Sequence, residues 1–294
     1  MAKTLHQSKS SADDFTIVNS FPFGYRNRED ITNLPAGVLV TGSQNVLTNV
    51  SERVQIRQGY TLDGQANTSS TNGGIVSSFD WDRHNAVQRN LRAYGTVLEY
   101  RYVNSAGTVT WRTLLSSLTS VSFNFANFWD FTTEKISLLL MVNGTSNVYE
   151  WSGATAEIAS VGVNTLTKSG TDTWGTAGFY TAGTRKVTIG GIDYAYTGGE
   201  TTTTLTGVAP DPALAAPPIV AGDIVHQTPR TTTNASMTGI PAAFANALIS
   251  NLRNQIYIGS LTDASIYISK VNNYKDYSFA TPRVVGEGMR IELD

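Results

Sequence analysis

The stretch that decides the fold is ISLLLMVNGTSNVYEW, residues 136–151. Its first half, Ile136–Val142, is aliphatic at almost every position but far shorter than the ~20 residues of a membrane-spanning helix. A short continuous apolar run of this kind is typical of a buried strand. Asn143-Gly144 is a favoured pair for a tight hairpin turn, and Val148–Trp151 supplies the return arm. The stretch therefore predicts an antiparallel hairpin in the core.

Two other stretches follow the same plan of strand, turn and short strand with an aromatic residue near its end. They are VLEYRYVNSAGTVTWRTL, residues 97–114, and NQIYIGSLTDASIYISKVNNYKDYSF, residues 254–279; residues 46–64 form a weaker copy. A hairpin alone cannot bury both faces, whereas small sheets stacked face to face can. The repeat therefore predicts an all-β, propeller-like fold of repeated antiparallel blades. A β-sandwich with regular hairpins would show similar alternation and is the alternative.

The composition changes inside the chain and predicts an inserted domain. Residues 165–228 combine short strands joined by Gly-Gly turns with a Pro/Ala-rich connector at 209–223. We expect this segment to be a small β domain that interrupts a platform made of residues 15–164 and 229–294. Residues 1–14 are predicted to be a flexible arm. Residues 241–254 have helical spacing and form either a short helix or the approach to the next strand.

The overall composition narrows the function classes. Charged residues make up 15% of the 294 residues and the formal net charge is −2, so the basic excess of a sequence-independent nucleic-acid binder is missing. The chain contains no cysteine, which excludes disulfides, thiol nucleophiles and cysteine-based zinc sites. The polar N-terminus has no apolar region typical of a secretory signal. We expect no cofactor and no membrane anchor.

The most enzyme-like stretch is FDWDRHN, residues 79–85, in which Asp80, Asp82 and His84 alternate. Residues that alternate along a strand share one face, where two carboxylates and an imidazole could bind a divalent cation or transfer protons. A solvated strand end before a turn produces the same pattern and is the preferred interpretation. His6, His84 and His226 are too far apart in sequence to form a histidine-rich metal site.

Asp130 and Glu134, close to Trp129, could form a glycosidase carboxylate pair. Such residues more commonly mark a polar strand end, and we prefer that interpretation. The five tryptophans could stack against sugars, but their places near strand ends favour packing between blades. These are Trp81, Trp111, Trp129, Trp151 and Trp174. The sequence therefore predicts no catalytic, cofactor-binding or metal-binding residue.

Two turns resemble the Asp-box of sialidase-type propellers. One is NSAGTVTW, through Gly107, Thr110 and Trp111, and the other is SKVNNYKDY, a degraded form, through Ser269, Asn272 and Tyr277. The polar residues of that motif hold a turn and do not catalyse. The resemblance therefore supports the architecture and leaves activity open.

Three longer stretches resemble structural proteins of tailed bacteriophages. Residues 34–64 match an opening tract through Gly42, Asn45, Arg57 and Gly59. Residues 254–288 resemble a later blade of the same proteins, and residues 187–208 resemble small β insertions in tail components. Proteins of the nozzle type are usually longer, so either this chain is short for the family or a neighbouring chain completes its fold.

The resemblance implies a virion protein of the tail nozzle or hub type, without enzymatic activity. Such a protein would assemble as a homo-oligomeric ring around the DNA exit path. It would contact the tail adaptor, portal, and tail-tip or fibre proteins, and DNA would pass through it during ejection without sequence-specific binding. A receptor- or carbohydrate-binding tail protein is the alternative function, and a sialidase-like hydrolase is a third.

Overall fold

The computed structural model describes residues 6–9, 14–17, 46–48, 54–56, 74–82, 88–260, 265–279 and 287–292. The chain divides into two compact units, Met1–Leu62 and Asp63–Asp294. The first unit contains two antiparallel hairpins: β1 (His6–Lys9) with β2 (Asp14–Ile17), and β3 (Val46–Thr48) with β4 (Val54–Ile56). The segment 1–14, expected to be a flexible arm, thus includes a paired strand.

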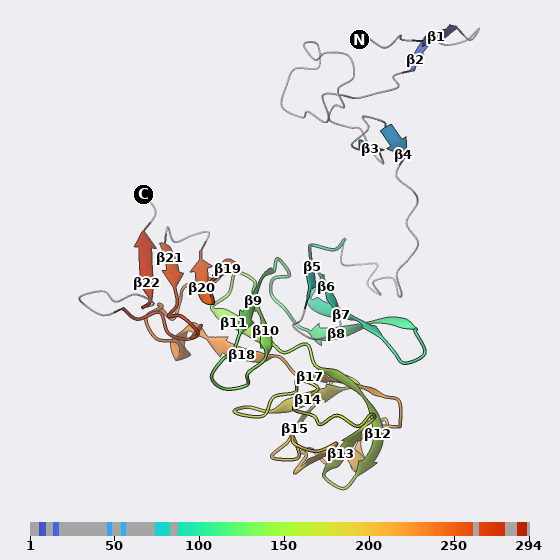
Figure 1. The fold of residues 1–294 in the computed structure, drawn as a ribbon, viewed down its shortest axis with the longest axis vertical. Helices are drawn as coiled ribbons and strands as arrows, with labels where there is room; N and C mark the ends of the chain where they lie inside the picture. The colour runs from blue at the N-terminus through green and yellow to red at the C-terminus, as the bar shows by residue number, and fades with distance from the viewer. Residues whose placement is uncertain are drawn as a thin grey trace. The chain divides into compact units, whose positions relative to one another are not determined.

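The described residues of the second unit form three four-stranded antiparallel sheets (Figure 1). The first sheet is formed by β5 (Ser77–Trp81), β6 (Arg89–Tyr94), β7 (Val97–Val103) and β8 (Val109–Leu115). The second sheet is formed, in spatial order, by β18 (Arg230–Thr233), β11 (Asn147–Trp151), β10 (Ser137–Val142) and β9 (Asn124–Trp129). The third sheet is formed by β19 (Leu248–Leu252), β20 (Gln255–Gly259), β21 (Ser265–Ile268) and β22 (Met289–Glu292). The predicted all-β class with blade-like antiparallel sheets is confirmed.

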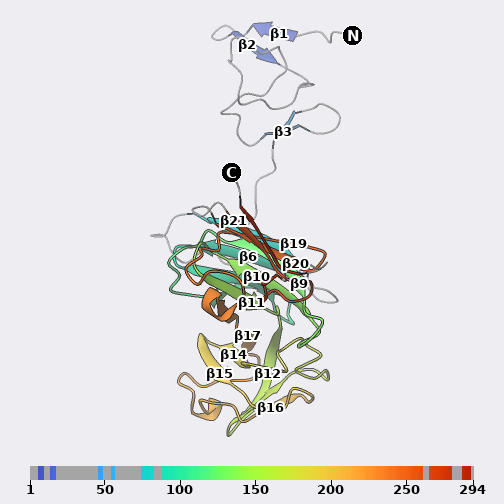
Figure 2. The same ribbon diagram turned by 90° about the vertical axis from the view of Figure 1, so that its left-hand side faces the viewer.

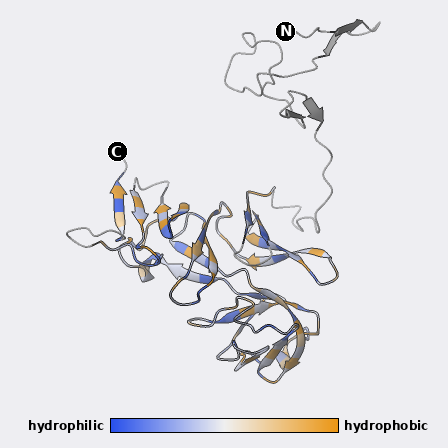
Figure 3. Cartoon of the chain, viewed as in Figure 1, coloured by the Kyte–Doolittle hydropathy of each residue, from blue (hydrophilic) through white to orange (hydrophobic). Residues whose placement is uncertain are grey.

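The second sheet is covered on both of its faces, which explains the aliphatic run at its centre. All six residues of β10 are buried. Leu138, Leu140 and Val142 join a hydrophobic cluster with the third sheet, whereas Leu139 and Met141 join a cluster with the first sheet. Alternate side chains of a strand point to opposite faces, so one strand serves two sheet–sheet interfaces. Hydrophobic and hydrophilic residues are interleaved along the strands of the sheets (Figure 3).

The strands between β11 and β18 in the sequence form a six-stranded antiparallel sheet (Figure 2). This sheet has a hydrophobic core of its own. Its strands in spatial order are β15 (Ile192–Ala195), β14 (Lys186–Ile189), β17 (Ile224–Gln227), β12 (Thr155–Gly162), β13 (Thr165–Lys168) and β16 (Thr204–Thr206). The short 3-10 turns η2 (Pro212–Leu214) and η3 (Asn234–Ser236) lie before β17 and after β18. We call residues 155–227 the inserted domain.

The inserted domain starts earlier in the chain than the sequence analysis placed it. Thr155 already pairs with His226 across β12 and β17, ten residues before the expected boundary at 165. The change in composition identifies the glycine-rich turns of the inserted domain. Strand β12 has an ordinary strand composition, so the sequence does not show that the domain begins there. Because Asn147 of β11 pairs with Thr233 of β18, the second sheet continues across the insertion.

Two other details differ from the sequence interpretation. Residues 241–254 contain no helix, and Leu248–Leu252 form strand β19 instead. In addition, the repeated hairpins occupy different places: residues 97–114 form the last two strands of the first sheet, whereas 136–151 and 255–268 form the middle strands of theirs. Alternation identifies a hairpin but carries no information about its position within a sheet.

Candidate functional site

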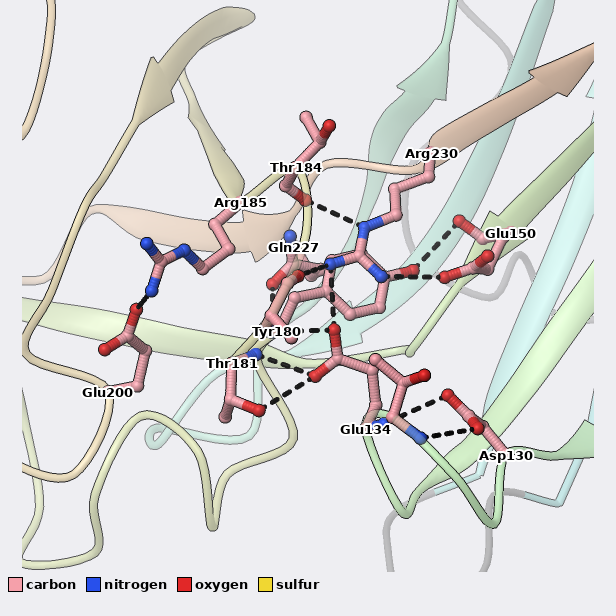
Figure 4. A network of polar contacts seen from close by, with 12 residues as sticks. Asp130, Glu134, Glu150, Tyr180, Thr181, Thr184, Arg185, Glu200, Gln227 and Arg230 are labelled. Atoms are coloured by element: carbon pink, nitrogen blue, oxygen red, sulfur yellow. Dashed lines mark hydrogen bonds and ion pairs between the residues drawn. The ribbon is translucent and has the colours of Figure 1, made fainter. Parts of the chain in front are cut away.

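A buried polar network lies where the inserted domain meets the second sheet, and Arg230 is at its centre (Figure 4). Arg230 is the first residue of β18, directly after the chain leaves the inserted domain. Its Nη2 donates to Glu134 Oε1 at 2.8 Å and its Nη1 to Glu150 Oε1 at 3.1 Å. Its Nε donates to the Thr184 carbonyl at 2.8 Å, and Nη2 also donates to the Ala182 carbonyl. One guanidinium thus joins two carboxylates to a loop of the inserted domain.

Glu134 binds that same loop from the turn between β9 and β10. Its Oε2 accepts from the backbone N–H and the hydroxyl of Thr181, at 2.7 and 3.0 Å. Its Oε1 accepts from the Ala182 N–H at 3.3 Å. Glu134 is buried, and a buried carboxylate needs this number of donors to offset its lost hydration. The contacts fix residues 181–182 against the second sheet.

Glu150 lies on β11 and connects the network to the third sheet. It is 2% exposed, and the hydroxyl of Tyr274, which follows β21, donates to its Oε2. Lys275 Nζ lies 3.6 Å from the same oxygen. The Tyr180 hydroxyl of the inserted domain donates to the Glu150 carbonyl at 3.0 Å. Three separate parts of the second unit therefore converge on Glu150 and Arg230.

Gln227, the last residue of the inserted domain, extends the network to the first sheet's hydrophobic cluster. Its Oε1 accepts from the Tyr180 N–H at 2.8 Å, and its carbonyl accepts from the Trp151 indole at 2.9 Å. Gln227 is fully buried. Gln227, the last residue of β17, is thus bonded both to the inserted domain, through Tyr180, and to the second sheet, through Trp151.

The electrostatics of this network fix its charge states. Burial alone would lower the pKa of Arg230, but Tyr180, Glu150 and Glu134 outweigh it and raise that pKa. Burial, followed by the neighbouring Glu150, raises the pKa of Tyr274 and of Tyr180 well above the usual range. Both phenols therefore stay neutral and act as donors. The Arg230 guanidinium also lies 3.5 Å from the centre of the Tyr180 ring, a cation–π contact.

A cavity of about 510 Å³ opens beside the network. Most of its lining is polar, with five threonine side chains and the three cations Lys186, Arg230 and Lys275. Lys186 Nζ lies 4.0 Å from Asp193 Oδ2, so the charges around the cavity are largely paired. The arrangement offers adjacent donors and acceptors to a polar ligand.

The alternating acidic stretch does not form a site within the described residues. Asp80 accepts a hydrogen bond from Asn90 at 2.6 Å across β5 and β6, and Asp82 is exposed. His84 lies outside the described residues. The contacts of Asp80 are those of a solvated strand end.

Asp130 and Glu134 have different partners and separate roles. Asp130 accepts from the backbone N–H groups of Thr132, Thr133 and Glu134, at 2.9 to 3.0 Å. Burial would raise the pKa of Asp130, but these N–H donors outweigh it and lower that pKa. Asp130 therefore holds the β9–β10 turn that presents Glu134 to Arg230.

Trp81, Trp151 and Trp174 are buried in hydrophobic clusters. The Trp151 ring lies 6.0 Å from that of Trp81, between the first and second sheets. His226 is buried beside Tyr100, with ring centres 5.2 Å apart. Within the described residues, no group of three or more histidine, aspartate or glutamate side chains is arranged to hold a metal ion.

Local sequence patterns do not single out Arg230, Glu150, Tyr180 or Tyr274 as members of one site. One signal was present for Glu150, a lone charge inside the apolar strand NVYEW, because such a charge needs a buried partner. Arg230 lies 80 residues further along the chain and has no comparable signal.

Comparison with protein-family models, with curated proteins and with solved structures yields no match. Among the described residues, no helix has the length and apolar character needed to cross a membrane.

Proposed function

We propose that this chain is a structural protein of a tailed-bacteriophage virion, a nozzle- or hub-like part of the tail without catalytic activity. The observation that carries the proposal is the Arg230 network, which ties the inserted domain, the second sheet and the segment after β21 together. A buried ion pair adds little net stability, because desolvation offsets the attraction between its charges, and in some proteins it fixes the geometry instead. A fixed platform that carries a second domain suits a component of an assembly.

The tail assignment rests on the sequence resemblance at Gly42, Asn45, Arg57 and Gly59 and in residues 254–288. In this role the chain forms a ring around the DNA exit path and contacts adaptor and tail-tip proteins. A formal net charge of −2 suits a passage that must not retain DNA, because phosphate binding depends on clustered lysine and arginine.

Particle analysis tests this proposal. Mass spectrometry of purified virions should find the chain in a fixed copy number, and electron cryomicroscopy should locate it in the tail. A chain that is missing from purified particles, while the other virion proteins are detected, would overturn the proposal.

The cavity beside Arg230 supports a second candidate function, recognition of a carbohydrate receptor. Its threonines and its Lys186–Asp193 pair could bind sugar hydroxyls, which both donate and accept hydrogen bonds. A glycan array with the purified full chain tests this candidate. Binding that is lost in Lys186→Ala supports it, whereas an array without any signal refutes it.

A further inference from the structure

The third sheet has two unlike faces. One face carries Ile249, Ile258 and Tyr267, which pack in the cluster shared with the second sheet. On the other face, residues that are paired across the four strands form rows. The first row is Leu248, Gly259, Ile266 and Ile291, and the second is Ser250, Tyr257, Ile268 and Met289. Leu252 and Gln255 complete this face, which we call the outer face.

The outer face is apolar and open to solvent along its first row and at Leu252, whereas Ile268 in the second row is buried, with 5% of its surface exposed. Leu248 is 48% exposed, Leu252 59% and Ile291 39%, while Tyr257, Ile266 and Met289 are partly exposed. None of these six side chains belongs to a hydrophobic cluster of the described residues. An ideal Cβ on Gly259 would lie 3.6 Å from Leu248 and 3.9 Å from Ile266, which confirms that the row is continuous. Contiguous exposed apolar surface of this kind marks an interaction site.

We propose that the outer face binds the outer face of a second copy of this chain, as two sheets packed face to face. The same chain already shows this mode of packing twice, on both sides of the second sheet. The described outer face has no charged side chain, so a two-fold contact opposes no like charges. An isologous contact requires such self-complementarity.

The other end of the stack does not fit this face. The first sheet, on the side away from the second, carries Arg92 and Glu99, joined at 2.8 Å, with the Tyr94 hydroxyl donating to Glu99 at 2.9 Å. These three residues are buried. In a head-to-tail contact, the aliphatic side chains of the outer face would meet the buried Arg92–Glu99 pair of another copy. In a contact between two outer faces, aliphatic side chains meet aliphatic side chains.

The size of the face predicts a weak contact. Four strands about 4.8 Å apart, each about five residues long, cover roughly 300 Å². Two copies would bury less than the roughly 1,200 Å² of a typical stable interface. We therefore expect a weak, concentration-dependent dimer of the isolated chain. The biological role of this dimer rests on the proposed function; its existence does not.

Sedimentation velocity of the purified full chain tests the proposal. The wild-type chain should dimerise reversibly as its concentration rises to roughly 100 µM, the range of weak interfaces. The double variant Leu248→Lys, Leu252→Lys should dissociate at least tenfold more readily, because four lysines would meet in the contact. The matched control is Val163→Lys with Leu214→Lys, which changes two exposed apolar residues, 73% and 81% exposed, in the inserted domain. It should dimerise like the wild type.

Gly259→Glu provides a second test, because a side chain there starts in ordinary contact with its neighbours and adds a charge at the centre of the face. Circular dichroism verifies that each variant is folded. A wild-type chain that stays monomeric, or folded variants that dimerise as strongly as the wild type, would overturn the proposal. A monomeric chain that is nevertheless found in virions would overturn only the second-copy contact. A dimer that is missing from virions would overturn only the proposed function.

Discussion

Leu139 and Leu140 are adjacent on β10, yet their side chains lie in different hydrophobic clusters. Leu139 packs with Trp151 and Tyr100 toward the first sheet, and Leu140 packs with Ile258 and Tyr277 toward the third. Both are fully buried. Strand β10 therefore contributes side chains both to the interface with the first sheet and to the interface with the third sheet. The packing of the three sheets depends on this strand.

The first prediction follows from that position. Leu139→Ala and Leu140→Ala should each lower the free energy of unfolding by about 2–5 kcal/mol, because each leaves a cavity in a different interface. The cavities face opposite sides of the sheet, so coupling between these adjacent positions would pass through the β10 backbone, and the double variant measures it. Urea denaturation measures the stability of each variant. Leu214→Ala, at an 81% exposed position, is the control and should change stability by less than about 0.5 kcal/mol.

The sequence was sufficient to predict β10 and its hairpin, because a strand buried on both faces is apolar at almost every position; Ser137, its polar first residue, donates a hydrogen bond to Asn127. Gly144 takes the left-handed conformation expected of its turn, with φ +82°. The sequence was not sufficient to place β19. Phe244, Ala247 and Leu248 are spaced for one helical face, but the apolar cluster of the third sheet contacts Ile249 through strand alternation. Tertiary packing overrides local periodicity at such a position.

The second prediction concerns the loop that joins β18 to the third sheet. Gly239 has φ +83°, and a Cβ there would lie 2.6 Å from the backbone of Tyr277 and Ser278. Gly239→Ala should therefore cost about 1–3 kcal/mol of stability through strain, and more where the backbone must also move. Gly107→Ala is a matched control, because Gly107 has φ +80° with open space around its Cβ position. Thermal unfolding of both variants separates the clash from the conformational cost. Equal losses would contradict the predicted close approach.

The third prediction is a pH dependence that originates at His226. Burial, followed by the charge of Arg112, lowers the pKa of His226 from 6.5 to about 3, and its Nε2 has no hydrogen-bond partner among the described residues. As the pH falls below 6.5, the unfolded chain takes up a proton that the folded chain refuses. This group should therefore reduce stability by about 1.4 kcal/mol per pH unit between pH 6.5 and 3, and leave it unchanged above pH 6.5.

Comparison with a variant isolates this contribution from the other titrating groups. His226→Gln should reduce the loss of stability between pH 7.5 and pH 5 by roughly 2 kcal/mol relative to the wild type. Urea denaturation at the two pH values gives the difference directly. Equal slopes in both proteins would show that His226 titrates normally in the folded state.

The Arg230 network shows why the site was harder to predict than the fold. Glu134, Glu150 and Arg230 come from a turn and two strands, and the inserted domain separates Glu150 from Arg230 in the sequence. Their contact depends on β11 pairing with β18, a relation that no local pattern encodes. The sequence favoured a polar strand end for Glu134, with a glycosidase pair as the alternative, and did not indicate Arg230 as its partner.

The fourth prediction tests whether this network holds the inserted domain in place. Arg230→Gln leaves two buried carboxylates without their shared cation and should cost about 3–5 kcal/mol of stability. Arg230→Lys keeps the charge but loses the planar fork, so its cost should be smaller. Hydrogen exchange should accelerate at the Thr181 and Ala182 amides, since Glu134 accepts from both. Exchange within β12 and β17, inside the inserted domain, should change much less.

A variant in which all three charged residues are neutral separates two contributions to the lost stability: the cost of an unpaired buried charge and the loss of hydrogen bonds. The triple variant Glu134→Gln, Glu150→Gln, Arg230→Gln has no unpaired ion, so it should recover most of the stability that Arg230→Gln loses. Its Thr181 and Ala182 amides should still exchange faster than in the wild type, because amide acceptors are weaker than carboxylates. If the triple variant is no more stable than Arg230→Gln, packing of the guanidinium against Tyr180, and not charge pairing, holds the inserted domain on the second sheet.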